Sequence, residues 1–318
     1  METKSKTIHS NTSVPMVKLV THNGSFHADD VFAAATLSLM LEKKGESFEI
    51  IRTRNHEIIK EGDYVFDVGG TYDADANRFD HHQIGGAGKR PVLPSLGGEN
   101  GIEYASFGLV WKKFGKELTG SDKIVELIDK HIAIPIDASD NGFDLVESKY
   151  NALPYSIQHF FESMSPTWRE TNITDDEIFL KCIEIAKIVL SREIIQARDS
   201  ILAEEKVISI YQKATDKRII VLDENYPYQD ILDNLKELLF IIYPRTNDNL
   251  WGVKAARKNK TTFKNRKDFP KSWAGLRDEE LQKVTGVSDA VFCHKALFLA
   301  VAKSKEGAIK LAELALSV

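Results

Sequence analysis

The sequence predicts an α/β protein of two domains, in which a mainly parallel N-terminal sheet flanked by helices precedes a smaller α/β domain. Two observations support this prediction. Short β-branched runs alternate with longer helical segments, which is typical of a sheet whose parallel strands are joined by helices. The 318 residues, 42% hydrophobic and 28% charged, are enough for one large or two medium domains with well-filled cores.

The first expected elements are a strand, a loop and a helix. Val17 to Thr21 is a β-branched run, a glycine-containing turn follows, and Asp29 to Leu41 carries small and apolar residues over about three helical turns. Phe48 to Ile51 and Tyr64 to Val68 have the composition of further buried strands. Since the carboxyl ends of parallel strands meet at one edge of a sheet, side chains just beyond these strands should converge.

A long loop and several helices follow. Ile84 to Gly101 holds six glycines and two prolines in eighteen residues, so no regular element fits it. A lid over the histidines before it and a floppy insertion are equally compatible with this loop. Helices are expected from Tyr104, over Lys123 to Ile134 and over Asp175 to Lys206, and the last of them begins with a Thr-Asp-Asp-Glu capping box at Thr174.

The remaining elements predict a second α/β unit. The expected limits are a flexible N-terminus over residues 1–16, a first domain over residues 17–205 that includes the long helix, and a second domain over residues 206–318. The second domain is expected to contain strands at Arg218 to Leu222, Leu239 to Ile242, Trp251 to Ala255 and Val291 to Cys293, and helices near Asp230 to Leu238 and Lys305 to Leu316.

Composition excludes several classes of protein. The longest apolar run, Val31 to Leu41, has eleven residues, whereas a bilayer crossing needs about 20. The N-terminal residues lack the apolar core of a secretion signal and the arginine-rich pattern of an import signal. Two distant cysteines, Cys182 and Cys293, form neither a disulfide framework nor a cysteine-based zinc site. A cytoplasmic protein without a membrane partner is expected.

Positive charge gathers in one stretch of a chain whose net charge is −5. Between Trp251 and Arg277 there are nine basic residues and one acidic residue, a local net charge of +8. Such a basic strip on an acidic protein is either an anion-binding surface or a solvated loop. Four of its aromatic residues, Trp251, Phe263, Phe269 and Trp273, either stack on bases or fill a core, and a core role is favoured for the two tryptophans.

Histidines and carboxylates concentrate in two short motifs. HNGSFHADD begins at His22, FDHHQ begins at Phe79, and Asp67 ends the strand between them. Imidazole and carboxylate ligands without thiolate suit manganese, magnesium, iron or zinc at a site with open positions. Taken alone, Asp29 or Asp30 could instead cap the helix that follows. Because the three groups follow three successive strands of one sheet, a two-metal centre is the preferred interpretation.

A fourth acidic group lies in IDASDNG, where Asp137 and Asp140 leave an apolar helical segment for a glycine-containing turn. On its own, this group is best interpreted as a helix C-terminal turn.

In their order along the chain, these motifs resemble the DHH phosphoesterase superfamily and, more closely, the melanocyte proliferating gene family of exonucleases. The resemblance extends from about residue 17 to residue 316. It rests on HNGSFHADD, on Asp-Val-Gly-Gly from Asp67, on Asp-His-His-Gln from Asp80, on Phe-Gly-Leu-Val-Trp from Phe107, on the Asp-Asn-Gly turn, and on Trp-Ala-Gly-Leu-Arg-Asp-Glu-Glu-Leu from Trp273.

The resemblance implies a two-domain DHH-type phosphoesterase that holds two divalent metal ions in its first domain, usually Mn²⁺, with Mg²⁺ as the alternative. Asp80 would orient His81, and His82 would donate to the phosphate. Asp137 competes with Asp140 as a ligand, and which histidine of the first motif binds is open, because the wider superfamily uses the spacing His-x-x-x-Asp-x-Asp there. The implied ligands are Asp67, as the bridge between both ions, and His22, His27, Asp29, Asp30, His81 and Asp140; the implied catalytic residues are Asp67, Asp80 and His82.

The activity implied by the resemblance is 3′-to-5′ hydrolysis of single-stranded RNA or of a short oligonucleotide, with release of mononucleotides. In the superfamily the second domain carries a glycine-rich run that ends in a substrate-contacting histidine, but here His294 is followed by KALFLAV without a glycine cluster. Arginines of the basic strip are therefore expected to supply phosphate contacts. The candidate substrate-binding residues are Lys89, Arg90, Arg257, Arg266, Arg277 and His294.

Two other functions stay open at this point. The same fold suits a small-molecule phosphoesterase that acts on pyrophosphate or a short dinucleotide. A protein that kept the ligands without turnover would instead bind RNA or sense metal. The oligomeric state is open as well, and a homo-oligomer fits each of these functions.

Overall fold

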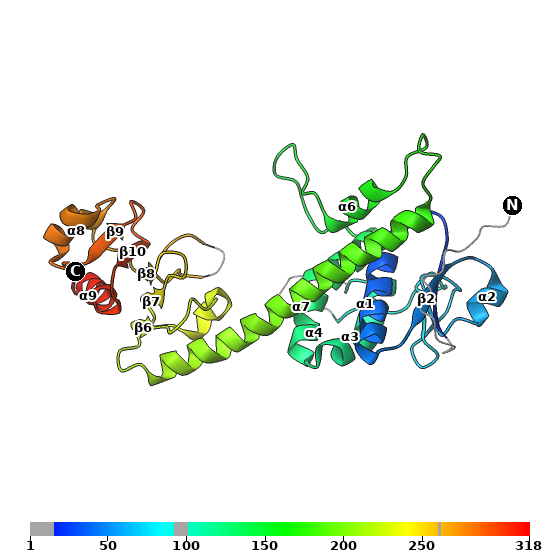
Figure 1. Cartoon of the computed structure of the whole chain (residues 1–318), viewed down its shortest axis with the longest axis horizontal. Coiled ribbons are helices and arrows are strands. Elements are labelled where there is room, and N and C mark those ends of the chain that lie inside the picture. Colours follow the sequence, from blue (N-terminus) through cyan, green and yellow to red (C-terminus); the bar gives the residue numbers. More distant parts are fainter. Residues whose placement is uncertain (1–15, 92–100, 260–261) are drawn as a thin grey trace. The chain divides into compact units, whose positions relative to one another are not determined.

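The computed structural model describes residues 16–91, 101–259 and 262–318. It is an α/β protein with two mixed sheets and two compact units, of which the first ends at Ala197 and the second begins at Arg198 (Figure 1). The dividing point lies within helix α7, Asp175–Lys213, which also contains the predicted boundary near residue 205. Of the predicted flexible N-terminus, Met16 alone is among the described residues. None of the described helices is long and apolar enough to cross a bilayer.

The first unit is built on a five-stranded sheet with the order β2-β1-β3-β5-β4. β1 pairs in parallel with β2 and β3, β3 pairs in parallel with β5, and β4 pairs antiparallel with β5. The predicted parallel pairing of the three longer strands is confirmed, whereas β4 and β5 escape prediction because two residues are too few to show a periodic pattern. The strands are β1 Val17–Thr21, β2 Phe48–Arg52, β3 Tyr64–Phe66, β4 Tyr72–Asp73 and β5 Arg78–Phe79.

The core of the first unit lies around helix α1, which is buried on nearly all sides. This burial explains why the segment is filled with small and apolar residues without a clear amphipathic period. Phe32 of α1 contacts the rings of Phe107 and Phe161, with centroid distances of 5.2 and 5.8 Å. Besides α7, the helices of this unit are α1 Ala28–Lys44, α2 His56–Lys60, α3 Ser106–Thr119, α4 Asp122–Ile128, the π-helical turn η2 Asp129–Ala133, α5 Ile134–Asp140 and α6 Ile157–Met164.

The chain is helical without a break from the start of α4 to the end of α5, which is further than the predicted limit at Ile134. The π-helical turn η2 joins the two helices, and Pro135 stands in the first turn of α5, where its missing N–H removes a regular helix hydrogen bond. As a result Asp137 and Asp140 lie on α5 itself. The predicted C-terminal turn follows them, with Gly142 at a φ of 73°.

The predicted capping box of α7 is confirmed. The backbone N–H of Glu177 donates to the Thr174 hydroxyl at 3.2 Å, and the N–H of Thr174 donates to the Glu177 carboxylate at 3.3 Å. The predicted loop over Ile84 to Gly101 is irregular where it is described. Its residues 92–100 lie outside the described part of the chain, so both interpretations of this loop stay predictions.

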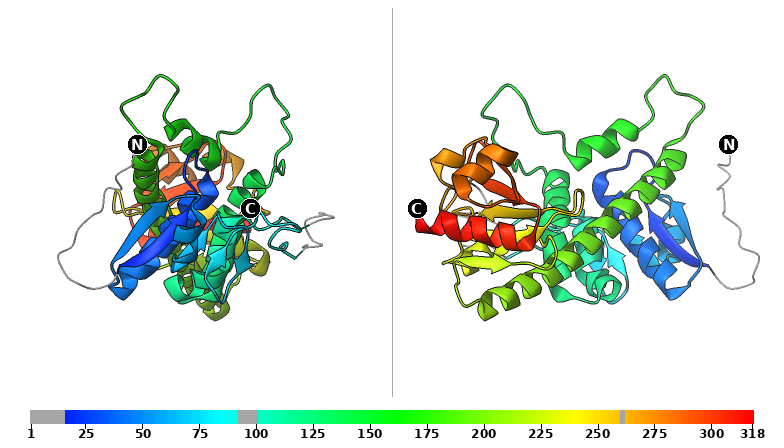
Figure 2. Two further views of the ribbon diagram at one scale, coloured as in Figure 1. Left: turned by 90° about the vertical axis from the view of Figure 1, so that its right-hand side faces the viewer. Right: turned by 60° about the vertical axis from the view of Figure 1, so that its left-hand side comes forward.

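The second unit contains a five-stranded sheet with the order β6-β7-β8-β10-β9. β6 and β7 are parallel, the other neighbours are antiparallel, and α9, red in Figure 2, packs along β7, β8 and β10. The predicted strands and the C-terminal helix are confirmed, and β10 and α8 escape prediction. The elements are β6 Ile219–Val221, the 3₁₀ turn η3 Gln229–Asn234, β7 Phe240–Pro244, β8 Trp251–Ala255, the 3₁₀ turn η4 Lys271–Trp273, α8 Asp278–Thr285, β9 Ala290–Cys293, β10 Leu299–Ala302 and α9 Lys305–Ser317.

The helix predicted near Asp230 to Leu238 is wrong, because the structure forms only the short turn η3 there. The guanidinium of Arg266 donates to the carbonyls of Leu232 and Leu238, at 2.7 and 3.2 Å. The carbonyls of Leu232 and Leu235 also accept the backbone N–H groups three residues ahead, so the segment forms single 3₁₀-type turns to which Arg266 is bound. The apolar pattern of the segment is therefore satisfied by burial of an irregular chain rather than by a helix face.

The position of Phe32 in the core makes a stability prediction. Phe32→Ala should lower the free energy of unfolding by about 3 to 5 kcal/mol, because it removes a fully buried ring between two other rings. Urea denaturation followed by circular dichroism measures this change. Ile188→Ala is the control, since Ile188 is 65% exposed. A loss for Phe32→Ala no larger than that of the control would contradict the packing of α1 described above.

Candidate metal centre

Strand ends and a helix end bring the two histidine motifs together at one edge of the first sheet. His22 directly follows β1, Asp67 follows β3 and Asp80 follows β5. Because these three strands are parallel, their carboxyl ends reach the same edge, as the sequence predicts. Asp29 and Asp30 reach this edge from the first turn of α1, where the partial positive charge of the helix end favours carboxylates.

Asp67 is the central side chain of the cluster. Its buried carboxylate has Oδ2 at 3.0 Å from His22 Nε2 and Oδ1 at 3.3 Å from His81 Nε2. The hydroxyl of Ser106 donates to Oδ1 at 3.1 Å. The backbone φ of Asp67 is 54°, an uncommon value for a residue with a side chain. Ser106 is missed by sequence reasoning, although it directly precedes the Phe-Gly-Leu-Val-Trp motif.

The described residues contain three sets of side chains whose potential ligand atoms lie within 4.8 Å of one another. Asp67 belongs to two sets, with His22 and Asp30 in one and with His81 and His82 in the other. Both histidines of the first motif therefore reach the cluster, each with its own carboxylate partners. The third set is His27, Asp29 and Asp140.

His81 links the third set to the others. Its Nε2 lies 3.2 Å from Asp140 Oδ2 and 4.0 Å from Asp29 Oδ2, in addition to its contact with Asp67. His27 Nδ1 lies 3.5 Å from Asp140 Oδ1. The structure thus brings all the predicted ligands into one contiguous cluster, and their role as ligands stays a proposal.

Unpaired buried atoms show that this cluster fits cations. Both carboxylate oxygens of Asp29 are buried without a hydrogen-bond partner among the described residues, and Oδ2 of Asp30 and Nε2 of His81 have ion-pair contacts, to His22 at 3.4 Å and to Asp140 at 3.2 Å, but no hydrogen bond. An ionised carboxylate without a partner is costly to bury, and a bound cation removes that cost. The donors are nitrogen and oxygen, which suits the hard or borderline divalent ions that the sequence predicts.

The close charges shift the pKa values of the cluster in opposite directions. Burial and neighbouring carboxylates raise the pKa of Asp29 well above its usual value, and burial with the charge of Asp67 raises the pKa of Asp30 to about 7. Burial also acts to raise the pKa of Asp67, but the imidazoles of His22 and His81 outweigh it and hold that pKa well below its usual value. Burial acts to lower the pKa of His81, but the carboxylates beside it raise it to about 10.

Asp80 orients His82 rather than His81, which corrects the expectation from the resemblance. Asp80 Oδ1 lies 2.7 Å from His82 Nδ1 and also accepts the backbone N–H of His82 at 3.0 Å. The second oxygen of Asp80 accepts the N–H of Gly70. The Asp80 carboxylate is therefore held by the Asp-Val-Gly-Gly turn and fixes the ring of His82.

The structure separates the roles of Asp137 and Asp140, which the sequence leaves open. Asp140 contacts two histidines of the cluster. Asp137 is fully buried, with its carboxylate 2.7 Å from the Arg90 guanidinium and accepting the N–H of Gly108 at 3.0 Å. A side chain at position 108 would collide with the Asp137 carboxylate, so packing requires the glycine of the Phe-Gly-Leu-Val-Trp motif. The geometry supports Asp140 as the ligand.

Arg90 is not placed to bind substrate, contrary to the expectation from the sequence. It is 6% exposed and binds Asp129 as well as Asp137. Its positive charge is paired and its N–H groups are hydrogen-bonded within the first unit. Arg90 therefore anchors the segment that carries it. Lys89 next to it is exposed and pairs with Glu103 at 2.8 Å.

The other candidate substrate residues lie in the second unit. The Arg266 guanidinium is committed to backbone carbonyls, so this residue too is structural. Arg257 stacks over Phe263 at 4.7 Å, Arg277 stacks over Phe292 at 4.4 Å, and His294 stacks on Phe298 at 4.4 Å. Their contact with substrate stays a proposal.

The aromatic residues of the basic strip divide into core and surface. Trp273 and Phe269 are buried in the second core, which confirms the core role predicted for that tryptophan. Trp251 is half-buried against the same core. Phe263 is exposed, and the Arg257 guanidinium lies over its ring. Lys260 of the strip lies outside the described residues.

A pocket of about 900 Å³ opens beside the His–Asp cluster. Its volume lies in the range of ligand-binding pockets. His22, Asp67, Asp80 and His82 line it, and sequence reasoning missed Arg54, His56 and Ile59. The lining residues come from segment 22–25 with His27, from Arg54, His56 and Ile59, from segment 67–70, and from Asp80 and His82.

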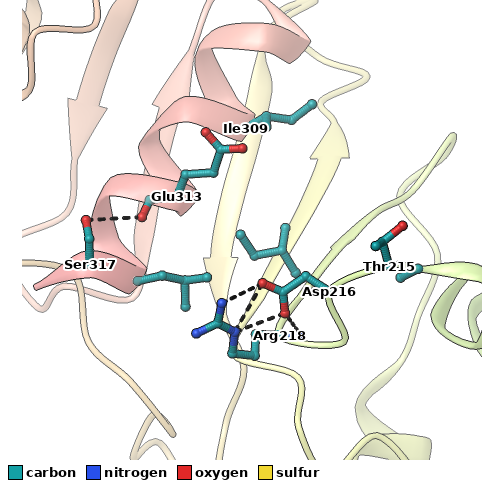
Figure 3. Close-up of a pocket in the computed structure, with 9 residues that line it drawn as sticks. Thr215, Asp216, Arg218, Ile309, Glu313 and Ser317 are labelled. Carbon is teal, nitrogen blue, oxygen red and sulfur yellow. Dashed lines mark hydrogen bonds and ion pairs between the residues drawn. The ribbon is translucent and has the colours of Figure 1, made fainter.

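Another pocket, in the second unit, offers less chemistry (Figure 3). Its volume is about 400 Å³, and residues around β6 and on α9 line it. The lining includes no histidine, and its one arginine, Arg218, is bound by Asp216 at 2.7 Å. We therefore assign the functional site to the first unit.

The buried ion pair predicts a large loss of stability on mutation. Arg90→Ala should lower the free energy of unfolding by about 3 to 5 kcal/mol, because the Asp137 carboxylate then stays buried without its partner. Lys89→Ala is the matched control and should cost less than about 1 kcal/mol, since its ion pair is exposed. Urea denaturation of both variants is the measurement, and equal losses would mean that the Arg90 pair does not hold the fold.

The pKa shifts predict how divalent ions bind. Ion binding must displace protons from Asp30, whose pKa is about 7, and from His81, whose pKa is about 10. Below these values the groups are protonated, so the affinity for Mn²⁺ should rise with pH, by roughly tenfold per unit for each displaced proton. Calorimetry between about pH 6 and pH 8, in buffers of different ionisation enthalpy, reports affinity and proton release together. An affinity independent of pH would contradict this assignment of the ligands.

Known proteins match this chain over nearly its whole length. The family model MYG1_exonuc, described as an uncharacterised protein family (UPF0160), matches residues 18–316. A MYG1 protein of Schizosaccharomyces pombe is 26% identical over 95% of this chain and 98% of the relative, and one of Dictyostelium discoideum is 28% identical over 92% and 94%. The MYG1 exonuclease of Homo sapiens is 29% identical over 94% of this chain and 86% of the relative. The resemblance found in the motifs is thus confirmed, and the chain belongs to the MYG1_exonuc family.

Proposed function

We propose that this chain is a divalent-metal-dependent phosphodiesterase that releases mononucleotides from the 3′ end of single-stranded RNA. The observation that supports it best is the position of Asp67, which is shared by two sets of potential ligands. Enzymes that hydrolyse phosphodiesters commonly place two metal ions about 4 Å apart with a shared ligand. The exonuclease name of the human relative points to the same class of reaction.

In this proposal the chain has the two-domain arrangement of DHH phosphoesterases, with a catalytic domain over residues 17–205 and a substrate-binding domain over residues 206–318. The His–Asp cluster lies in the first unit, and the basic strip lies in the second. A phosphate backbone is attracted by such a strip, and the attraction falls as salt is added. Mn²⁺ is the proposed ion, with Mg²⁺ as the alternative, because nitrogen and oxygen donors accept both.

Two bound divalent ions would lower the pKa of a water molecule and neutralise the charge that develops on the phosphate. The chain's own residues position this chemistry. The Asp67 carboxylate, held by Ser106 and by its own backbone conformation, contacts both His22 and His81 and would be the ligand that the two ions share. Asp29 and Asp30 add two carboxylates to the cluster, and their negative charge would help to hold the ions.

His82 is the proposed hydrogen-bond donor to the phosphate. Its side chain is 61% exposed and lines the pocket, while Asp80 fixes Nδ1 of the ring. Hydrogen bonding to Asp80 outweighs burial and raises the pKa of His82, which favours the doubly protonated ring. Nε2 then carries a proton that it can donate to an anionic oxygen.

Removal of the shared carboxylate tests the proposed function. Asp67→Asn should lower Mn²⁺-stimulated hydrolysis of labelled single-stranded RNA more than about 100-fold, because even weaker supporting contacts of metal ligands cost about 10- to 100-fold. Asp75→Asn is the matched control, since Asp75 is exposed and remote from the cluster. Equal turnover by both variants and by the wild type would mean that the activity belongs to a contaminant.

A length series of single-stranded RNA separates the proposed substrate from smaller ones. The proposal expects stepwise release of mononucleotides from oligonucleotides of every length tested. Cleavage limited to dinucleotides, trinucleotides or pyrophosphate would instead assign the site to a small-molecule phosphoesterase. Binding of Mn²⁺ and RNA without any turnover would assign it to a non-catalytic binding protein.

A further inference from the structure

Arg54 is an uncommitted arginine in the wall of the pocket beside the metal cluster. It lies between β2 and α2, beyond the carboxyl end of a parallel strand, as do His22 and Asp67. Its side chain is exposed and makes no hydrogen bond or ion pair within the described part of the chain. An exposed arginine is usually a solvated side chain, so its surroundings decide whether it has a role.

Arg52, two residues earlier, is by contrast a structural arginine, because its donors are bound within the fold. Its guanidinium donates to the carbonyls of His22 and Gly24 and pairs with Asp176 at 2.7 Å. Arg52 therefore ties the segment that carries Arg54 to the loop that carries His22. These two segments of the pocket lining are therefore held together without any contact from Arg54.

The charges in the pocket leave Arg54 without a carboxylate of its own. Of the side chains that line it, two are acidic, Asp67 and Asp80, and both are bound to histidines. Arg54 is the one arginine or lysine in this lining. His56 lies close in sequence and lines the same pocket, so the segment around Arg54 contributes donors and no carboxylate to the lining.

The backbone at two glycines of the lining leaves room for a ligand. Gly24 and Gly70, with φ values of 87° and 67°, both line the pocket, and a side chain at either position would meet no atom within 4 Å. A ligand can therefore approach the chain closely at these points. With a volume of about 900 Å³, the pocket has space beyond the single phosphate that the cluster would hold.

We propose that Arg54, together with His56, binds a second phosphate group of the substrate, next to the phosphate held at the metal cluster. The inference rests on the proposed phosphodiesterase function and adds a specificity to it. A guanidinium binds phosphate through two parallel hydrogen bonds, and in this pocket no carboxylate competes for them. The preferred substrate then carries at least two phosphates at the spacing found in a nucleotide chain.

The test compares two probes that differ by one phosphate. Calorimetry in the presence of Mn²⁺ measures binding of a nucleoside 5′-monophosphate and of the same nucleoside 3′,5′-bisphosphate to the full chain. The wild type should bind the bisphosphate about tenfold or more tightly than the monophosphate, since a charge-assisted bidentate contact contributes that much. Arg54→Ala should reduce this ratio to about one, and Arg54→Lys should leave an intermediate ratio, because lysine keeps the charge without the planar pair of donors.

Arg169→Ala is the matched control, since Arg169 is an exposed arginine of the first unit that packs on Trp168 outside the pocket. It should keep the wild-type ratio. A wild type without preference for the bisphosphate, or an Arg54→Ala variant that keeps the preference, would overturn the inference. RNA hydrolysis by the wild type is assayed in parallel. Hydrolysis without the preference removes this inference alone, whereas an Arg54-dependent preference without hydrolysis removes the proposed function and leaves the phosphate site.

Discussion

The burial of several like-charged carboxylates beside histidines is the constraint on which the rest of the first unit depends. Asp29 and Asp30 are fully buried next to Asp67, so they repel one another and lose their hydration. The imidazoles of His22 and His81 and the N-terminal end of α1 offset part of this cost. Unpaired oxygens on Asp29 remain, and a bound cation would offset the cost of their burial. The cluster therefore constrains folding as well as offering potential ligands.

A second buried ion pair, between Arg90 and Asp137, holds α5 in place beside the cluster. Arg90 joins the segment after the DHH motif to Asp137, and Asp137 accepts a hydrogen bond from Gly108 on α3. Asp140 lies one turn further along the same helix and reaches His81. Arg90 and Asp137 thus hold α5 in the position from which Asp140 reaches the cluster, although neither of them touches the cluster. The π-helical turn before α5 and Pro135 set where that helix begins.

Positive charge is used in two different ways in this protein. Three arginines bind carbonyls and carboxylates of the fold: Arg52, Arg90 and Arg266. The sequence suggested substrate binding for Arg90 and Arg266. Arg54 lines the pocket beside the cluster and makes no hydrogen bond or ion pair to any described residue, whereas Arg277 lies over an aromatic ring in the second unit. A count of basic residues does not distinguish these cases, because the distinction lies in which acceptor each guanidinium meets.

The sequence by itself determined the parallel core of the first sheet and the ligand types of the site. Composition marks β1, β2 and β3 as buried strands and α1 as a run of small and apolar residues, and the rule that parallel strands end at one edge is enough to gather His22, Asp67 and Asp80. Tertiary structure alone brought Asp140 rather than Asp137 to the cluster, paired Asp80 with His82, and made Arg90 structural. These outcomes depend on contacts between segments tens of residues apart, such as Arg90 with Asp137, and no local pattern encodes the distance between two such side chains.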